Sequence, residues 1–138
     1  MKKAIFSTPL GWAGAGIIEK GLCRIVLPRG SQKTAKSELT NMQRKISKAA
    51  ASRSSDRDMK KTVKLLQQYF SGRRESFDLP LDLSYYTPFQ RAVWKAAATI
   101  PYGETRSYAW IAKKIGRPNA ARAVGQALGA NPVPILIP

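Results

Sequence analysis

Histidine is absent from the 138 residues, and cysteine occurs only once, at Cys23. Without histidine the chain has no His-based catalytic triad, no histidine general base and no histidine metal ligand. A single cysteine excludes an intramolecular disulfide and a zinc knuckle. No metal site is therefore expected.

Long apolar runs are also missing. No stretch reaches the length of a membrane span, and residues 1–7 lack the apolar core of a signal peptide. A membrane partner is not expected. The predicted compartment is the reducing cytosol, with association with the nucleoid if the source is prokaryotic.

Acidic residues are scarce. The chain has 24 Lys and Arg against 8 Asp and Glu, a formal net charge of +16. Residues 86–138 carry 7 basic residues and one acid, Glu104, so their net charge is 7 − 1 = +6. A surface that is basic because acids are missing favours a polyanion, most simply a nucleic acid. A membrane surface and a plain solubility surface are the alternatives.

The first half predicts a small sheet covered by a helix. Residues 3–27 indicate a β-meander, with strands over 4–7, 14–18 and 22–27 separated by glycine-containing turns. The basic stretch 29–55 has few large apolar residues and is predicted to be either a mobile loop or a weak helix. A helical apolar stripe then follows, formed by Met59, Val63, Leu66 and Phe70. Residues 73–86 are predicted to be an extended linker.

The second half is denser in helix signals. Thr87 is a candidate N-cap with Pro88 at the first helical position. Ser107 is predicted to cap a short helix, and Asn119 a second one over 120–128 that Gly129 ends. Two short helices joined by a tight turn form a helix-turn-helix pattern. The predicted fold is an α/β domain, 1–83, containing the basic stretch of about 30–55, followed by a helical domain, 84–138.

The helix predicted over 120–128 has an unusually bare outer face. If Ala121, Val124 and Leu128 are buried, its exposed long side chains are those of Arg122 and Gln126. A helix that reads the major groove usually offers several long polar side chains. A bare helix fits the minor groove with Arg122 as a probe; the alternative is tight helix packing with a solvated arginine. The mid-helix glycine, Gly125, indicates close approach of a backbone, from the protein or from a nucleic acid.

Several segments carry a family resemblance. The second-half segments are 87–94 (TPFQRAVW), 100–104 (IPYGE), 107–108 (SY), 119–129 and 131–138 (NPVPILIP). They resemble the DNA-binding and active-site region of O6-alkylguanine-DNA alkyltransferases, the methylated-DNA–protein-cysteine methyltransferases. Residues 8–12 (TPLGW) are similar to that family's first domain. The resemblance implies a ribonuclease-H-like first domain and a winged-helix-like second domain.

The resemblance also implies a function and a site. The expected activity is single-turnover DNA repair: alkylated guanine is flipped out of double-stranded DNA through the minor groove, and its alkyl group moves to a cysteine of the protein. Arg122 matches the arginine that replaces the flipped base, and Tyr108 the tyrosine that crowds the phosphate. Asn131 matches a residue that braces a turn. The other matching positions are Arg117, Ala120, Ala121, Gly125 and Gln126 for DNA contact, and Val133 and Pro134 for the pocket wall. No cofactor is expected, and a monomer is.

One departure from the family concerns the acceptor. In relatives Cys-His-Arg follows the segment that ends here at Pro138, and that cysteine is the nucleophile. We therefore expect the acceptor directly after Pro138, and expect the chain as printed to be truncated and inactive. Cys23 is predicted to be a buried strand cysteine and no substitute. The alternatives are a non-catalytic, alkyltransferase-like protein that binds DNA damage, and an unrelated helix-turn-helix regulator.

Overall fold

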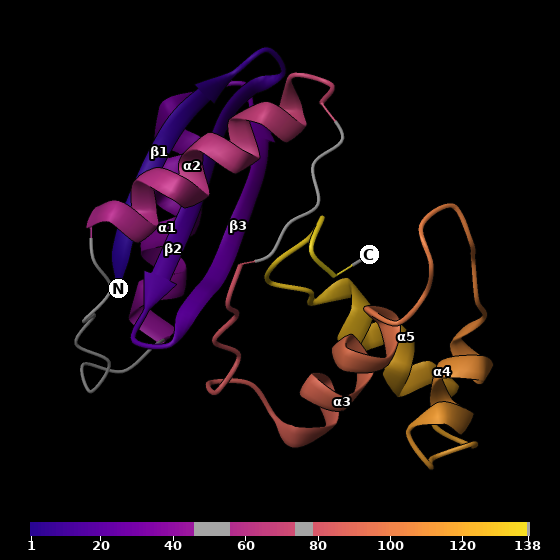
Figure 1. The fold of residues 1–138 in the computed structure, drawn as a ribbon. Coiled ribbons are helices and arrows are strands. Elements are labelled where there is room, and N and C mark those ends of the chain that lie inside the picture. Colours follow the sequence, from indigo (N-terminus) through magenta and orange to yellow (C-terminus); the bar gives the residue numbers. More distant parts are fainter. Residues whose placement is uncertain (46–55, 74–78, 138) are drawn as a thin grey trace. The chain divides into compact units, whose positions relative to one another are not determined.

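The computed structural model describes residues 1–45, 56–73 and 79–137. The chain divides into two compact units, Met1–Asp82 and Leu83–Pro138, coloured indigo to magenta and orange to yellow in Figure 1. The first unit combines a sheet with helices, and the second is helical. This agrees with the predicted class, an α/β unit followed by a helical one.

The sheet of the first unit has three antiparallel strands in the order β1-β2-β3. They are β1 (Lys2–Thr8), β2 (Gly11–Ile18) and β3 (Gly21–Arg29). The predicted β-meander is confirmed, with longer strands. Gly11 enters β2 with φ 123°, and a Cβ there would lie 2.5 Å from the carbonyl oxygen of Arg29. Only glycine fits this first turn.

Two helices cover opposite faces of this sheet: α1 (Gln32–Lys45) and α2 (Asp56–Phe70). Figure 1 shows α2 in front of the strands and α1 behind them. Alternation along β2 explains the division. A Cβ on Gly14 would lie 2.8 Å from Leu39 of α1, whereas Ile17 lines a small cavity together with Thr62 of α2.

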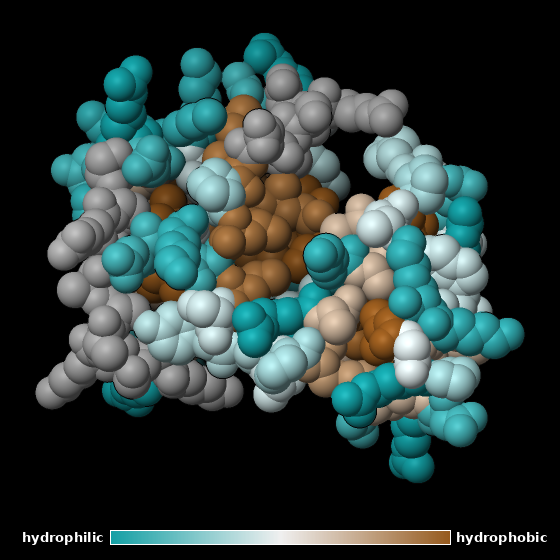
Figure 2. Space-filling model, turned by 60° about the horizontal axis from the view of Figure 1, so that its bottom comes forward, coloured by the Kyte–Doolittle hydropathy of each residue, from teal (hydrophilic) through white to brown (hydrophobic). Residues whose placement is uncertain are grey.

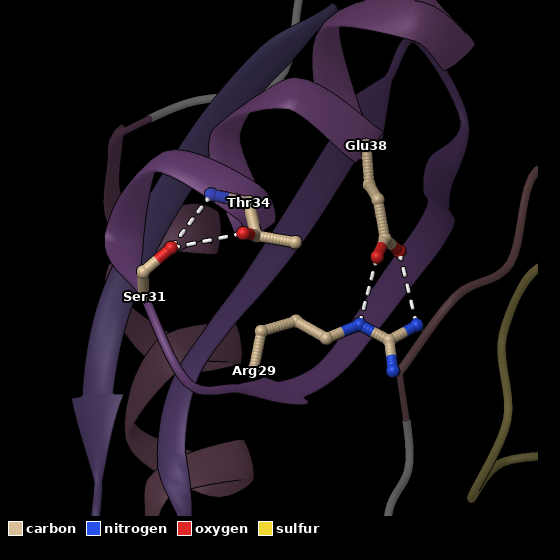
Figure 3. Close-up of polar contacts among 4 residues, drawn as sticks. All are labelled: Arg29, Ser31, Thr34 and Glu38. Atoms are coloured by element: carbon tan, nitrogen blue, oxygen red, sulfur yellow. Dashed lines mark hydrogen bonds and ion pairs between the residues drawn. The ribbon is translucent and has the colours of Figure 1, made fainter.

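The basic stretch 29–55 was predicted to be either a mobile loop or a weak helix. Its first part is the helix α1. The Thr34 amide donates to the Ser31 hydroxyl at 3.2 Å, and Arg29 donates twice to the Glu38 carboxylate, at 2.7 and 3.3 Å (Figure 3). Leu39 is buried in a cluster with Ala35 and Val26. A small apolar stripe and a cap are enough for a helix once a sheet lies beneath it. Residues 46–55 lie outside the described residues.

Helix α2 follows the predicted stripe. Leu66 and Phe70 are buried, while Met59 and Val63 are half-buried. Thr62 is buried as well, and its hydroxyl donates to the Asp58 carbonyl at 2.9 Å. The predicted helix packed on the sheet is confirmed.

Of the extended linker predicted over 73–86, residues 79–82 are extended but pair with the sheet, whereas residues 83–86 form a turn in which the Tyr86 amide donates to the Leu83 carbonyl at 3.0 Å. The Leu22 amide donates to the Pro80 carbonyl at 2.8 Å, and the Asp82 amide donates to the Leu22 carbonyl at 2.9 Å. These bonds form a parallel bridge between Leu22 and Leu81. Strand β3 is an edge strand, and its free backbone groups pair with this segment. Residues 74–78 lie outside the described residues.

The second unit contains helices α3 (Pro88–Ala97), α4 (Tyr108–Lys114) and α5 (Ala121–Gly129). The Thr87 cap is confirmed, and Gln90 completes a capping box with it. Ser107 caps α4 by accepting from the Trp110 amide at 3.1 Å. Gly116, with φ 76°, ends α4 in the left-handed conformation. The predicted pair of short helices joined by a tight turn is confirmed.

Trp94 of α3 holds the second unit together. Its side chain is fully buried, and its indole N–H donates to the Ala127 carbonyl at 2.8 Å. Tyr86 packs edge-on against the same ring, with 4.9 Å between centroids. Because Ala127 belongs to α5, this one side chain fixes α5 on α3 through both packing and a buried hydrogen bond.

Candidate nucleic-acid interface

Helix α5 begins later than the sequence predicts. Asn119 is not its N-cap: the cap residue is Ala120, which makes no side-chain cap hydrogen bond. The Ala120 amide instead donates to the Arg117 carbonyl at 3.0 Å, in a turn that precedes the helix. A local backbone turn therefore takes the place of the Asn cap.

The buried face of α5 is also rotated from the predicted one. Val124 and Ala127 are buried, whereas Ala121 and Leu128 are only half-buried. The hydrogen bond from Trp94 draws the Ala127 side of the helix into the core. The exposed face then carries Arg122 and Gln126 beside small residues. Of the predicted contact residues, Ala120, Ala121 and Gly125 border this face and are half-buried.

Tyr108 lies against α5 at Gly125. A Cβ on Gly125 would be 2.9 Å from Cε2 and 3.1 Å from Cδ2 of the Tyr108 ring. Tyr108 is nevertheless 54% exposed, so its ring reaches solvent beside the α5 face. The sequence predicts close approach of a backbone at this glycine, from the protein or from a nucleic acid; within the protein, the nearest neighbour is instead an aromatic side chain. Gly125 thus leaves space that holds Tyr108 against the helix.

Arg117 lies in the turn between α4 and α5. Its amide donates to the Ala112 carbonyl at 2.8 Å, and its guanidinium lies 5.9 Å from the centroid of the Phe89 ring. The side chain is exposed. Arg117 therefore helps to end α4 while its charge stays on the surface near α5.

Asn131 braces the segment that follows α5. Its amide group donates to the Ile137 carbonyl at 2.7 Å, and its carbonyl accepts from the Val133 amide at 3.0 Å. Val133 is buried, and Pro134, half-buried, is bridged to Ile137. Between them Ile135 adopts φ 84°, a strained conformation for a β-branched residue. No local sequence signal predicts this conformation of Ile135.

Sequence reasoning also missed a stacked group on α4. Two cations lie over the Trp110 ring: the guanidinium of Arg106, 5.5 Å from the ring centroid, and the ammonium of Lys114, at 4.8 Å. The spacing of four residues on each side of Trp110 could have indicated this arrangement. Lys114 also donates to the Thr99 hydroxyl at 2.6 Å. These contacts place two cations beside one ring on the outside of the second unit.

Positive charge dominates the second unit. Its 7 basic residues face a single acid, Glu104, which pairs with Arg106 at 3.3 Å. Hydrophilic residues, drawn in teal, cover much of the face shown in Figure 2, with hydrophobic residues gathered between them. The surface around α4 and α5 can therefore attract an anionic backbone.

Cys23 lies in the first unit, and its thiol is unreactive. Its thiol is 1% exposed and donates to the Gly16 carbonyl at 3.3 Å. Burial, with a smaller contribution from the negative charge of Asp82, raises the pKa of the Cys23 thiol to about 12. The thiolate is the nucleophilic form, so Cys23 is inert near neutral pH.

Residues 1–45, 56–73 and 79–137 contain neither a metal-binding cluster nor a membrane-spanning helix. No group of three or more Cys, Asp or Glu side chains there could hold a metal ion. Among these residues, no helix combines the length and hydrophobicity needed to cross a bilayer.

Comparison with known proteins places both halves of the chain in one family. Residues 18–83 match "6-O-methylguanine DNA methyltransferase, ribonuclease-like domain", and residues 88–138 match the "DNA binding domain" of the same family. A methylated-DNA–protein-cysteine methyltransferase of Mycobacterium tuberculosis is 58% identical over 76 residues, 55% of this chain and 46% of that protein. The constitutive enzyme of Bacillus subtilis is 56% identical over 73 residues, 53% and 44% of the two chains. The aligned part thus spans less than half of these curated relatives.

Solved structures of O6-methylguanine methyltransferases are similar to this chain over almost its whole length. The M. tuberculosis O6-methylguanine methyltransferase has a TM-score of 0.68 and 37% identity, covering 97% of this chain and 73% of that one. M. tuberculosis OGT in complex with DNA has a TM-score of 0.68 and 35% identity, with coverages of 99% and 74%. The chain belongs to the 6-O-methylguanine DNA methyltransferase family.

Proposed function

We propose that this chain recognises alkylated guanine in duplex DNA as part of a methylated-DNA–protein-cysteine methyltransferase. The observation that carries the proposal is the face of α5, where Arg122 stands among small residues. The minor groove of B-DNA is about 6 Å wide, while a helix with its side chains is about 10–12 Å across. A helix face without bulky side chains can come closest to such a groove, and one long cation can enter the base stack.

Arg122 and Tyr108 divide the flipping step between them in this proposal. Arg122 would occupy the space that the guanine leaves, which offsets part of the cost of unstacking. Tyr108 stands against Gly125 at the edge of the same face, where its ring would crowd a backbone phosphate. Ala120, Ala121 and Gln126 would contact the groove, and Arg117 a phosphate. Asn131, Val133 and Pro134 would support the pocket that receives the flipped base.

The transfer step needs a thiolate. In the proposed reaction the thiolate sulfur attacks the alkyl carbon, the bond from that carbon to O6 breaks, and its electron pair stays on the guanine, which then takes up a proton. Cys23 is the one cysteine of residues 1–138, and its buried thiol is a poor candidate. We propose that a cysteine beyond Pro138, as in relatives, accepts the alkyl group, and that the protein acts as a cytosolic monomer without a cofactor.

The inertness of Cys23 supports a second candidate, a protein that recognises the damage without transferring the group. A labelling experiment separates the two. The 138-residue chain and a longer chain ending in Cys-His-Arg are incubated with duplex DNA carrying O6-methylguanine labelled in its methyl group. We expect label on the extended chain alone. Label on Cys23 of the 138-residue chain would contradict both candidates.

Recognition itself is tested by binding. The ratio of dissociation constants for an undamaged duplex and the same duplex with one O6-methylguanine should exceed 1. Arg122→Ala should bring that ratio close to 1. The matched control is Lys113→Ala, which removes one exposed charge from α4 and should leave the ratio unchanged. Equal behaviour of the two variants would count against insertion of Arg122.

A further inference from the structure

Helix α2 carries a stripe of positive charge on its outward side. Arg57, Lys60, Lys61 and Lys64, here called the α2 ridge, follow each other at positions i, i+3, i+4 and i+7 and are all exposed. This spacing places them on one face of a helix. The buried residues Thr62, Leu66 and Phe70 lie on the opposite face. Figure 1 shows α2 lying along the sheet with its other side away from the strands.

Repulsion among the cations of the α2 ridge is only partly offset within the helix, where Asp56 and Asp58 stand four and three residues before Lys60 and Lys61. Like charges three and four residues apart destabilise a helix, and this ridge has several such pairs. None of its cations forms a salt bridge with another residue in the described part of the chain. The nearby Asp56 is hydrogen-bonded to Lys2 at 2.8 Å, which lowers the pKa of its carboxyl, with a smaller effect from Lys60. An external anion would remove the repulsion.

We propose that the α2 ridge binds the phosphate backbone of duplex DNA, as a contact surface of the first unit separate from α5. The proposal rests on the proposed function insofar as DNA is the partner. With a rise of 1.5 Å per residue, Arg57 and Lys64 are about 10 Å apart along the helix. Successive phosphates of one strand advance about 3.4 Å along the duplex, so the ridge spans about three such steps, enough to reach four successive phosphates. Such contacts add affinity without reading sequence.

The other helix of the first unit supplies a matched comparison. The exposed cations of α1, namely Lys33, Lys36 and Arg44, are spread over three turns with polar residues between them. Lys3 of β1 lies beside Lys36 around a shallow groove. These four residues carry the same total charge as the α2 ridge without its spacing. Substituting these four residues therefore tests whether an effect of the α2 ridge comes from a localised contact or from net charge in general.

The experiment measures the dissociation constant for an undamaged duplex between 50 and 200 mM salt. The ridge variant changes Arg57, Lys60, Lys61 and Lys64 to Gln, and the control variant changes Lys3, Lys33, Lys36 and Arg44 to Gln. If four phosphate contacts are lost, the slope of log K against log salt should fall by about 3.6. Over this fourfold range of salt the wild type would then lose about 150-fold more affinity than the ridge variant. The control should change the slope by less than about 1.

Equal changes in the two variants, or none in the ridge variant, would overturn the proposal. Loss of binding to anionic lipid vesicles, with the DNA slope unchanged, would assign the ridge to a membrane and overturn it as well. Lys64→Gln alone should lower the slope by about 0.9, so the test survives if the fourfold variant does not fold. The ratio of the dissociation constants for undamaged and damaged duplex should stay as in the wild type. Failure of the ridge and failure of damage recognition are therefore distinguishable.

Discussion

Helices α2 and α5 expose two different kinds of surface to solvent. On α2 four long cations share one stripe, while on α5 Arg122 is the one cation and its neighbours are small. Long flexible cations suit phosphates, which are reached from outside the duplex. Small residues suit a groove, where backbone and bases must come close. If both proposals hold, one strongly basic chain approaches DNA in two different ways, which its net charge alone does not distinguish.

The largest effect on the surface of α5 is expected from removing Trp94, the side chain that anchors this helix. Trp94→Ala deletes a fully buried ring and leaves the Ala127 carbonyl without its donor. We expect a loss of about 3–5 kcal/mol in the free energy of unfolding of the second unit, measured by urea denaturation. Trp110→Ala is the control: its half-buried ring contacts two cations and should cost about 1–2 kcal/mol. Similar losses for both would contradict the role given to Trp94.

The first unit should show its buried thiol in the pH dependence of stability. The Cys23 pKa is about 12 in the folded protein against an ordinary 9.0. Above pH 9 the unfolded chain loses this proton first, so the folded state is stabilised below pH 9 and loses that advantage as pH rises toward 12. The wild type should lose about 1.4 kcal/mol more per pH unit than Cys23→Ala over this range. Parallel stability curves would show that the thiol ionises equally in both states.

A smaller change tests how α5 holds Tyr108. Gly125→Ala improves helix propensity by about 1 kcal/mol but forces the Tyr108 ring to move, which costs about 1–3 kcal/mol. We expect a net loss of about 1 kcal/mol in thermal or urea unfolding. Gly129→Ala, on the same helix and with open space around it, should be neutral or stabilising. In a Tyr108→Ala background, Gly125→Ala should become stabilising; a loss of the same size there would contradict the contact.

Local signals predicted most of the fold. The glycine turns of the sheet, the α2 stripe and the caps at Thr87 and Ser107 each depend on a few neighbouring residues. The missed features depend on distant ones. Pairing of residues 80–82 with Leu22 requires knowing which strand lies at the edge, and the rotation of α5 follows from the hydrogen bond made by Trp94.

The candidate site was predicted from resemblance more than from spacing. The pattern of residues 120–128 indicated a bare helix but left groove insertion and simple packing open. That Tyr108 lies against Gly125 could not be predicted, because the two residues are 17 positions apart and meet only when α4 and α5 cross. The positive φ of Ile135 had no signal at all, since β-branched residues favour extended backbone.

The central claim is that α2 and α5 contact DNA in different ways, and one paired measurement tests it most directly. The ridge variant and Arg122→Ala are each assayed for the salt slope of DNA binding and for the fluorescence of 2-aminopurine at a flipped position, in the chain extended by Cys-His-Arg. In the ridge variant the slope of log K against log salt should fall by about 3.6, and the fluorescence change should be kept. Arg122→Ala should lose the fluorescence change and at most about 1 of slope. If both variants lower the two signals in the same proportion, the two helices are not distinct contact surfaces.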